Sequence, residues 1–383
     1  MTEPLSPTTT PVTGSGPGSA AESGAQSAAP GAHLRAEIAE QPARWRDLIP
    51  SQRDALDAAA ELIRSIAPEL IVFAARGSSD HAAQYGQYLA HNLLRTPAML
   101  ATPATASAFG VTLKYPRSVM LAVSQSGESP DLLETVRSAQ GAGVAVIAFT
   151  NDPSSTLARL GEVHVPLSAG PELSVAATKT YTAELLALHL VLSRAAGADW
   201  SSLEAAVEAV AAAGESTIRA AAEASPALAA GLREAQRILV VGRGYSMASA
   251  KEGALKLMET NAIAASGWSV ADATHGPLGQ VIAGTPVIVL AASPGGHASV
   301  ATFAAAAADL GAELIVVGAQ ELDGSTPVRS RIALPGLDSA GVPDELIPLI
   351  EILPLQQLAL ELALERGLNP DQPAGLNKVT RTH

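Results

Sequence analysis

The sequence lacks cysteine and is poor in basic residues. None of its 383 residues is a cysteine, which excludes disulfides, thiolate metal sites and a cysteine nucleophile within these residues. Its 24 Lys and Arg are outnumbered by 37 Asp and Glu, giving a net charge of -13. Because proteins that bind nucleic acid neutralise its phosphates with basic patches, we expect no nucleic-acid partner.

Long apolar runs are also missing. Runs such as 287–292 are the length of a strand, whereas a membrane helix needs roughly 20 apolar residues, so we expect no membrane partner. Residues 1–32 are rich in Ser, Thr, Pro, Gly and Ala. They lack the basic start and apolar stretch of a secretory signal. We therefore expect a disordered tail and a cytoplasmic protein.

The remaining chain alternates helical and strand patterns. Apolar residues at three- and four-residue spacing predict helices over 33–49 and 52–66. Short apolar runs at 70–75 and 119–123 each end in a Ser- and Gly-containing loop followed by a helical segment. Strands that alternate with helices in this way predict a parallel sheet buried between helices, which is an α/β fold.

This pattern occurs twice. After an Ala-rich helical stretch, the apolar run 238–241 ends in Gly242-Arg243-Gly244, and Gly242 lies 165 positions after Gly77. The runs beginning at Leu121 and Leu290 are 169 positions apart. We interpret this as an internal duplication that gives two lobes, each a doubly wound parallel sheet sandwiched by helices (flavodoxin-like or Rossmann-like). The alternative is a single long doubly wound domain.

Two loops at predicted strand ends have the chemistry of an anion site. Ligands of open parallel sheets bind at the carboxyl ends of the strands. There, Ser124, Ser126 and Ser129 supply hydroxyl donors, Gly127 permits close backbone approach, and the next helix adds free N–H groups. The Ser78-Ser79 pair adds two more donors. This cradle uses no Lys or Arg, and the alternative is that both loops are ordinary Ser-Gly turns with helix caps.

No cofactor is expected. Gly242-Arg243-Gly244 lacks the third Gly and the distal acid of a dinucleotide fingerprint, so we do not predict NAD. His81, His91, His164 and His189 show no common ligand spacing, so we predict no metal.

Several motifs together resemble the double-SIS (sugar isomerase) family, in particular the isomerase half of glucosamine-6-phosphate synthase. The resemblance covers roughly residues 35 to 383. The motifs at 75–79, 124–129 and 172–180 resemble the synthase's first SIS domain. The motifs at 242–244, 252–259 and 275–278 resemble its second SIS domain. The motifs at 371–373 and 376–380 resemble its C-terminal active-site tail. The resemblance implies a first SIS domain over 33–200, a helical linker over 201–230, a second SIS domain over 231–365 and the tail over 366–383.

The differences from the synthase favour a relative without glutaminase activity. The synthase has an N-terminal glutaminase domain with a catalytic Cys, whereas this chain begins with a short tail and has no Cys. The sequence therefore looks more like the stand-alone glucosamine-6-phosphate deaminases of the superfamily, whose tail resembles the Leu-Asn-Lys-Val-Thr at 376–380. Thr274, Ala177 and Ala374-Gly375 depart from the synthase pattern and leave the substrate open.

The resemblance also implies roles for individual residues. Glu259 would move the proton between C2 and C1, His275 would open the sugar ring, and Lys378, the family's Schiff-base lysine, would orient the sugar or stabilise charge. The family's site lies between two subunits, so a homodimer with His275 from the neighbouring chain is implied. The expected substrate-binding residues are Gly77, Ser78, Ser79, Ser124, Gln125, Ser126, Gly127, Ser129, Glu172, Val175 and Lys256.

The expected function is conversion of an amino-sugar phosphate, glucosamine 6-phosphate, to fructose 6-phosphate and ammonia. Two alternatives stay open. One is a lyase or isomerase that acts on N-acetylglucosamine 6-phosphate or galactosamine 6-phosphate. The other is a sugar-phosphate sensor that binds its ligand without turnover.

Overall fold

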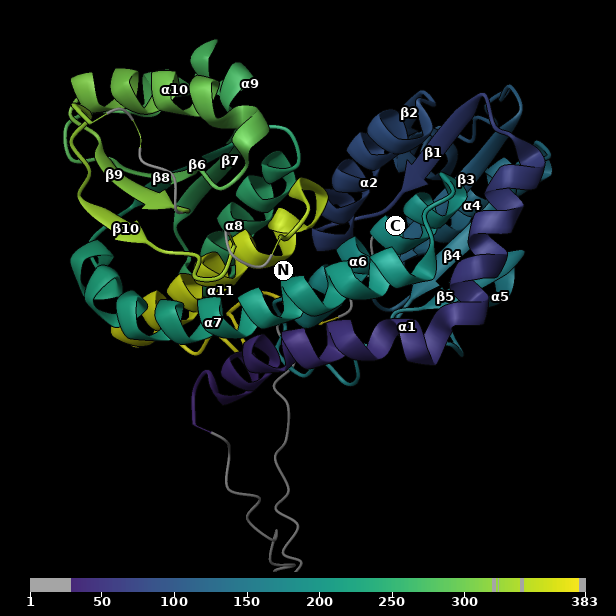
Figure 1. Ribbon diagram of the computed structural model, residues 1–383, viewed down its shortest axis with the longest axis horizontal. Helices are drawn as coiled ribbons and strands as arrows, with labels where there is room; N and C mark the ends of the chain where they lie inside the picture. The colour runs from purple at the N-terminus through teal and green to yellow at the C-terminus, as the bar shows by residue number, and fades with distance from the viewer. Residues whose placement is uncertain (1–28, 319–321, 323, 338–340, 379–383) are drawn as a thin grey trace, which may run out of the picture.

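The computed structural model describes residues 29–318, 322, 324–337 and 341–378. All but the last four residues of the predicted tail 1–32 lie outside these ranges. Within them, the chain forms two lobes side by side above the long helices α1 (Ala32–Ile66) and α7 (Trp200–Leu232) (Figure 1).

The first lobe contains a five-stranded parallel sheet in the order β2-β1-β3-β4-β5. Its central strand β3 is buried at every position, as expected for a parallel sheet covered on both faces. Its elements in chain order are β1 (Leu70–Ala74), α2 (Ser78–Leu94), β2 (Ala98–Leu100), α3 (Pro103–Ser107), β3 (Ser118–Ser124), α4 (Pro130–Gly141), β4 (Ala145–Thr150), α5 (Thr156–Leu160), β5 (Val163–Pro166) and α6 (Lys179–Ala195).

The second lobe repeats this arrangement. Its parallel sheet has the order β7-β6-β8-β9-β10, so its strands follow the same 2-1-3-4-5 order, which is the flavodoxin-like order. Its elements are β6 (Arg237–Gly242), α8 (Ser246–Asn261), β7 (Ala264–Ser269), α9 (Val270–Thr274), η1 (Pro277–Gln280), β8 (Pro286–Leu290), η2 (Pro294–Gly296), α10 (His297–Asp309), β9 (Glu313–Val317), β10 (Ser330–Ile332), η3 (Asp344–Leu346) and α11 (Ile347–Glu365).

A repeated buried hydrogen bond supports the duplication. Ser79 at the start of α2 donates its Oγ hydrogen to Glu184 of α6 at 2.7 Å, and Ser246 at the start of α8 donates to Glu351 of α11 at 3.0 Å. Each residue of the second pair lies 167 positions after its counterpart. The predicted two-sheet duplication is therefore confirmed, and the alternative of one long doubly wound domain is wrong.

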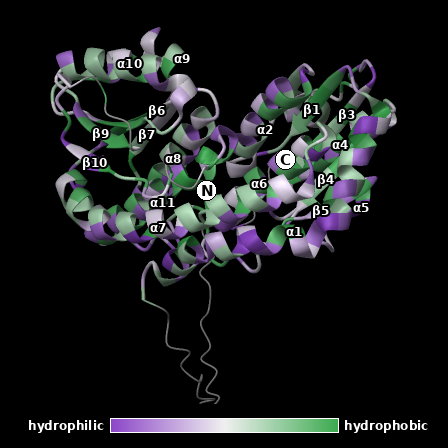
Figure 2. Cartoon of the chain, in the orientation of Figure 1, coloured by the Kyte–Doolittle hydropathy of each residue, from purple (hydrophilic) through white to green (hydrophobic). Residues whose placement is uncertain are grey.

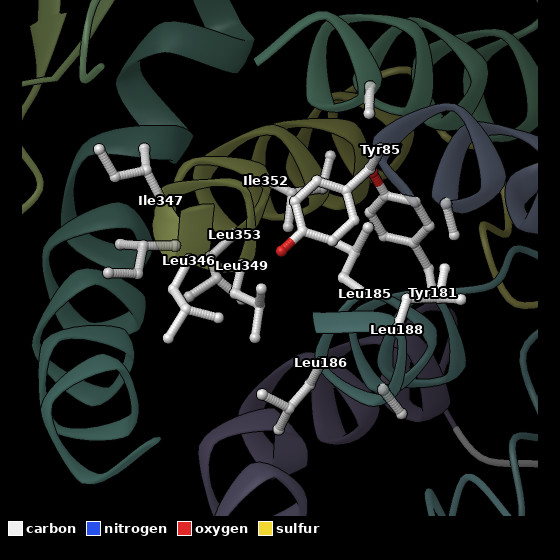
Figure 3. Packing of buried hydrophobic residues seen from close by; sticks show 14 of the residues in the cluster. Tyr85, Tyr181, Leu185, Leu186, Leu188, Leu346, Ile347, Leu349, Ile352 and Leu353 are labelled. Atoms are coloured by element: carbon white, nitrogen blue, oxygen red, sulfur yellow. The ribbon is translucent and has the colours of Figure 1, made fainter. Parts of the chain in front are cut away.

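The two lobes share one hydrophobic core. Strand residues of both sheets, such as Phe73 and Val240, belong to the same cluster of buried side chains. At the junction, Tyr85 and Tyr181 lie among leucines of α6 and α11 (Figure 3), and the Tyr85 hydroxyl donates to the Glu345 carbonyl at 2.7 Å. Figure 2 shows hydrophobic colour concentrated on the strands and hydrophilic colour on outer faces of the helices.

Helix α7 contains the segment 201–230 that was expected to be a linker. Its buried residues, among them Val207, Val210 and Leu228, join the shared core. Helix α11 and the turn before it, residues 344–365, are long and apolar enough to cross a membrane by length and composition alone. However, 94% of the scored window is buried inside the protein, where it forms part of the core.

Candidate active site

A cavity of about 370 Å³ opens at the carboxyl ends of β1 and β3, where ligands of open α/β sheets bind. Its walls are the start of α2, the loop before α4, one residue of α8 and the end of the described chain. The lining residues are Arg76, Gly77, Ser78, Ser79, Ser124, Gln125, Ser126, Ser129, Val175, Ala177, Glu259, Leu376, Asn377 and Lys378.

The loop between β3 and α4 is shaped by Gly127. Its φ of +64° lies in the left-handed region, which costs a residue with a Cβ about 1–2 kcal/mol. A Cβ at this position would lie 2.3 Å from the Ser155 Oγ, so only glycine fits. The Gly127 N–H donates to the Ser124 Oγ at 3.1 Å. This bond folds the loop so that the side chains of Ser124 and Ser126 border the cavity.

Arg76 adds a positive charge to the side of the cavity formed by the serine loops. It is not among the site residues expected from the sequence. Its Nε donates to Asp131 at 2.7 Å, and the arginine side chain is still 49% exposed. Burial would raise the pKa of Asp131, but the hydrogen bonds from Ser129 and Arg76 and the charge of Arg76 lower it below its usual value. The loop 124–129 itself contains no Lys or Arg, but Arg76 and the expected Lys378 line the same cavity.

Lys378, the last residue that the structure describes, lies at the site. Its Nζ lies 2.7 Å from the Glu172 carboxylate and 2.7 Å from the Ser174 carbonyl oxygen. The Glu172 side chain is fully buried, and burial would raise its pKa. The Lys378 charge and hydrogen bonds from Thr178 and Thr180 nevertheless hold that pKa below its usual value, so Glu172 anchors Lys378 as an ion pair.

A buried lysine joins the two lobes behind the cavity. The Lys256 Nζ lies 3.2 Å from Glu252 and 2.6 Å from Glu259 on its own helix α8, and it donates to Ser78 of α2 at 3.2 Å. On the far side, Glu252 contacts His81 of α2 at 2.8 Å. Burial would lower the pKa of Lys256, but the two carboxylates raise it above its usual value. Lys256 therefore carries its charge and fixes Glu259 against the hydroxyl-rich loop.

A further buried carboxylate, Glu184, lies behind Ser79. Burial raises its pKa well above the usual value, and the Ser79 hydrogen bond only partly opposes this shift. Neither Glu184 nor the His81–Glu252 pair is among the site residues expected from the sequence. Each of these contacts forms between helices that are far apart in the sequence, so no local sequence pattern predicts them.

The structure places the expected site residues in three groups. Ten of the expected site residues line the cavity: Gly77, Ser78, Ser79, Ser124, Gln125, Ser126, Ser129, Val175, Glu259 and Lys378. Gly127, Glu172 and Lys256 lie behind it and contact the lining residues. His275 is exposed on the second lobe and does not line this cavity. Among the described residues, no group of three or more metal-binding side chains exists.

Comparison with known proteins identifies relatives over most of the chain. Residues 67–194 and 231–364 match the SIS domain. Glutamine-fructose-6-phosphate aminotransferase (isomerizing) of Pyrococcus horikoshii is 30% identical over 346 residues, which are 89% of this chain and 56% of that protein. The enzyme of the same name from Thermococcus kodakarensis is 33% identical over 354 residues, again 89% and 56%. This chain thus spans about half the length of the curated relatives it matches.

The solved structures show the same fold. The C-terminal domain of glucosamine-fructose-6-phosphate aminotransferase from Francisella tularensis superposes with a TM-score of 0.79 at 23% identity, covering 89% of this chain and 98% of that chain. Glucosamine-6-phosphate deaminase from Thermotoga maritima gives 0.70 at 19% identity, covering 91% and 100%. At these identities the likeness concerns the fold alone.

Proposed function

The chain belongs to the SIS domain family, and from this premise we propose that it converts glucosamine 6-phosphate to fructose 6-phosphate and ammonia. The observation that carries the proposal is the position of Glu259. This carboxylate lines the same cavity as the serine loops and Arg76, so one small molecule can place a phosphate at the loops and a reacting carbon at Glu259.

Phosphate binding would use hydroxyls and one guanidinium. The side chains of Ser124 and Ser126 supply donors beside the N-terminus of α4, where the helix dipole favours an anion. Arg76 adds a charge-assisted donor. With the phosphate fixed there, the other end of the sugar extends toward Glu259 and Lys378. Such positioning supplies much of the rate enhancement in reactions of this kind.

The reaction needs one proton acceptor that also returns the proton. In the open-chain aldose, Glu259 removes the proton from C2, the electron pair forms a double bond between C1 and C2, and the aldehyde oxygen takes up a proton from water. Glu259 then delivers its proton to C1 while the amine nitrogen releases a proton to water, which leaves a hydroxymethyl group at C1 and an imine at C2. Water adds to C2 and ammonia departs, giving the ketose phosphate. Lys256 holds the Glu259 carboxylate in place at 2.6 Å, and Lys378, anchored on Glu172, faces the sugar hydroxyls.

The test incubates the protein separately with glucosamine 6-phosphate, galactosamine 6-phosphate and N-acetylglucosamine 6-phosphate, following ammonia and products by NMR. We expect ammonia and fructose 6-phosphate from the first. Glu259→Gln should lower the rate by about 10²–10⁴, whereas Glu223→Gln, an exposed glutamate of α7, should leave it unchanged. Elimination from the acetylated sugar alone would instead indicate a lyase, and binding without any product would indicate a sensor.

The exposed position of His275 allows a separate test. Because it does not line the cavity of its own chain, a role in ring opening requires a second copy to bring it there. If two copies share their sites, mixing the inactive variants Glu259→Gln and His275→Asn after subunit exchange should restore about a quarter of the wild-type activity, since half the dimers are hybrids with one intact site. No recovery in mixtures shown to contain hybrids would contradict a shared site.

A further inference from the structure

A second cavity, of about 310 Å³, opens at the carboxyl ends of β6 and β8 in the second lobe. Arg243, which follows β6, and Ser293, which follows β8, form one side of it. The last turns of α2, with Tyr88 and Asn92, and the start of η3, with Asp344, form the other. The cavity therefore occupies in the second sheet the place that the candidate active site occupies in the first.

The walls of the two cavities correspond residue by residue. The correspondence follows the 167-position offset of the Ser79–Glu184 and Ser246–Glu351 hydrogen bonds, with two more residues inserted before β8. The matched lining residues are Arg76 with Arg243, Ala177 with Asp344 and Glu259 with Asn92, all 167 positions apart, and Ser124 with Ser293 and Ser126 with Gly295, both 169 apart.

The second cavity is charged in a way that suits an anion. The side chain of Arg243 lies across Gly296 at the N-terminus of α10, where an added Cβ would meet the Arg243 Cβ at 2.6 Å. That helix has no acidic residue in its first turn and no side-chain cap. Arg243 donates a long hydrogen bond of 3.5 Å to the Ser269 Oγ, and no ion pair of Arg243 occurs among the described residues. The guanidinium of Arg243 and the positive end of the α10 dipole repel each other, and an anion bound between them would be attracted by both.

The opposite wall suits sugar hydroxyls. Asp344 is an acceptor when ionised, so it would repel a bare phosphate but accept hydrogen bonds from a polyol. Tyr88 and Tyr245 present aromatic rings 6.0 Å apart, and the Asn92 amide donates to the Tyr245 hydroxyl at 2.8 Å. We propose that this cavity is a second binding site for a phosphorylated sugar, with the phosphate at Arg243 and the hydroxyls at Asp344.

The difference between Glu259 and Asn92 decides what the second site does. The matched position carries a carboxylate in the first cavity and an amide in the second, and an amide cannot take up the C2 proton. The second site therefore lacks a carboxylate at the position that holds the base of the proposed reaction in the first. Helix α2 reaches from Ser78 in the first cavity to Asn92 in the second, a separation of roughly 20 Å at 1.5 Å per residue. The two ligands can bind at the same time.

The test measures binding of glucitol 6-phosphate, an open-chain sugar phosphate with no carbonyl to react, by isothermal titration calorimetry of the full chain. We expect two equivalents per chain. Arg243→Met keeps the side-chain stem over Gly296 but removes the charge, and it should weaken one equivalent at least about tenfold, as expected for a lost charge-assisted hydrogen bond. The matched control is Arg237→Met, at the opposite end of β6, which should keep both equivalents.

Other outcomes are equally decisive. One equivalent in the wild type, unchanged in Arg243→Met, would overturn the proposal. Inorganic phosphate binding at the second site as tightly as glucitol 6-phosphate would leave only an anion site. If Arg243→Met does not fold, Asp344→Asn serves instead, and it should reduce the preference for glucitol 6-phosphate over inorganic phosphate. Two equivalents without any ammonia release from glucosamine 6-phosphate would uphold this inference while refuting the proposed reaction.

Discussion

Replacing Lys256 with methionine tests the buried charge cluster at the junction of the lobes. The lysine side chain is 2% exposed and its partner Glu252 is fully buried. Methionine keeps most of the stem but removes the ammonium, so Glu252 keeps its hydrogen bond with the His81 ring at 2.8 Å but loses the lysine charge. Removing one member of a buried ion pair typically costs about 3–5 kcal/mol, because the other charge stays buried without compensation. We expect a loss of this size.

The measurement is guanidinium denaturation followed by tryptophan fluorescence, with Lys179→Met as the matched control. Lys179 is also 2% exposed, but its partner Glu40 is 38% exposed and can be solvated again, so the control should lose only about 1 kcal/mol. The double variant Lys256→Met with Glu252→Gln should recover about 1–3 kcal/mol relative to additivity. Equal losses for the two lysine variants, with no coupling to Glu252, would refute the reasoning.

Three further predictions concern other parts of the molecule. Burial raises the pKa of Glu351 to about 7 in the folded protein, against 4.5 in the unfolded chain. The stability that this carboxyl contributes is therefore full below pH 4.5 and is lost as the pH rises through 7. In denaturation curves between pH 4.5 and 8, the wild type should lose up to about 3 kcal/mol of unfolding free energy relative to Glu351→Gln. Gly127→Ala should cost more unfolding free energy than Gly110→Ala, because both have φ near +60° but only the former meets Ser155, whereas Gly110 faces open space; equal costs would contradict the packing argument. Arg76→Met should raise KM for the sugar phosphate about tenfold or more; an unchanged KM would remove Arg76 from the phosphate site.

The strands could be predicted closely because they are buried on both faces. The expected runs 70–75 and 119–123 correspond to strands β1 and β3 within one residue at each end. The expected helices 33–49 and 52–66 are instead one helix, α1, which continues through Pro50. A proline inside a helix costs about 3 kcal/mol, yet Leu48, Ile49 and Leu56 on either side of it are all buried, so packing outweighs the local penalty.

The site was predictable only where it is local. The serine loops follow directly from strand-to-helix junctions, so their position at the cavity could be expected from the sequence. The contact of Lys256 with Ser78 spans 178 positions, and that of Lys378 with Glu172 spans 206. Contacts of this kind depend on how α8 and the segment that contains Lys378 pack against the first lobe. Without the family resemblance, the sequence indicates a phosphate cradle but not which carboxylate faces it.

Each of the two cavities is lined by residues of both lobes. Helices α2 and α8 face each other between the sheets (Figure 1), and Lys251 of α8 donates to Gln84 of α2 at 2.7 Å, two positions that the 167-residue offset makes equivalent. Each helix begins beside the cavity of its own lobe and ends in the cavity of the other. Glu259 therefore lines the first lobe's cavity only because α8 comes from the second lobe. The proposed reaction needs a carboxylate at only one of the two equivalent positions, and the proposed second site has Asn92 at the other.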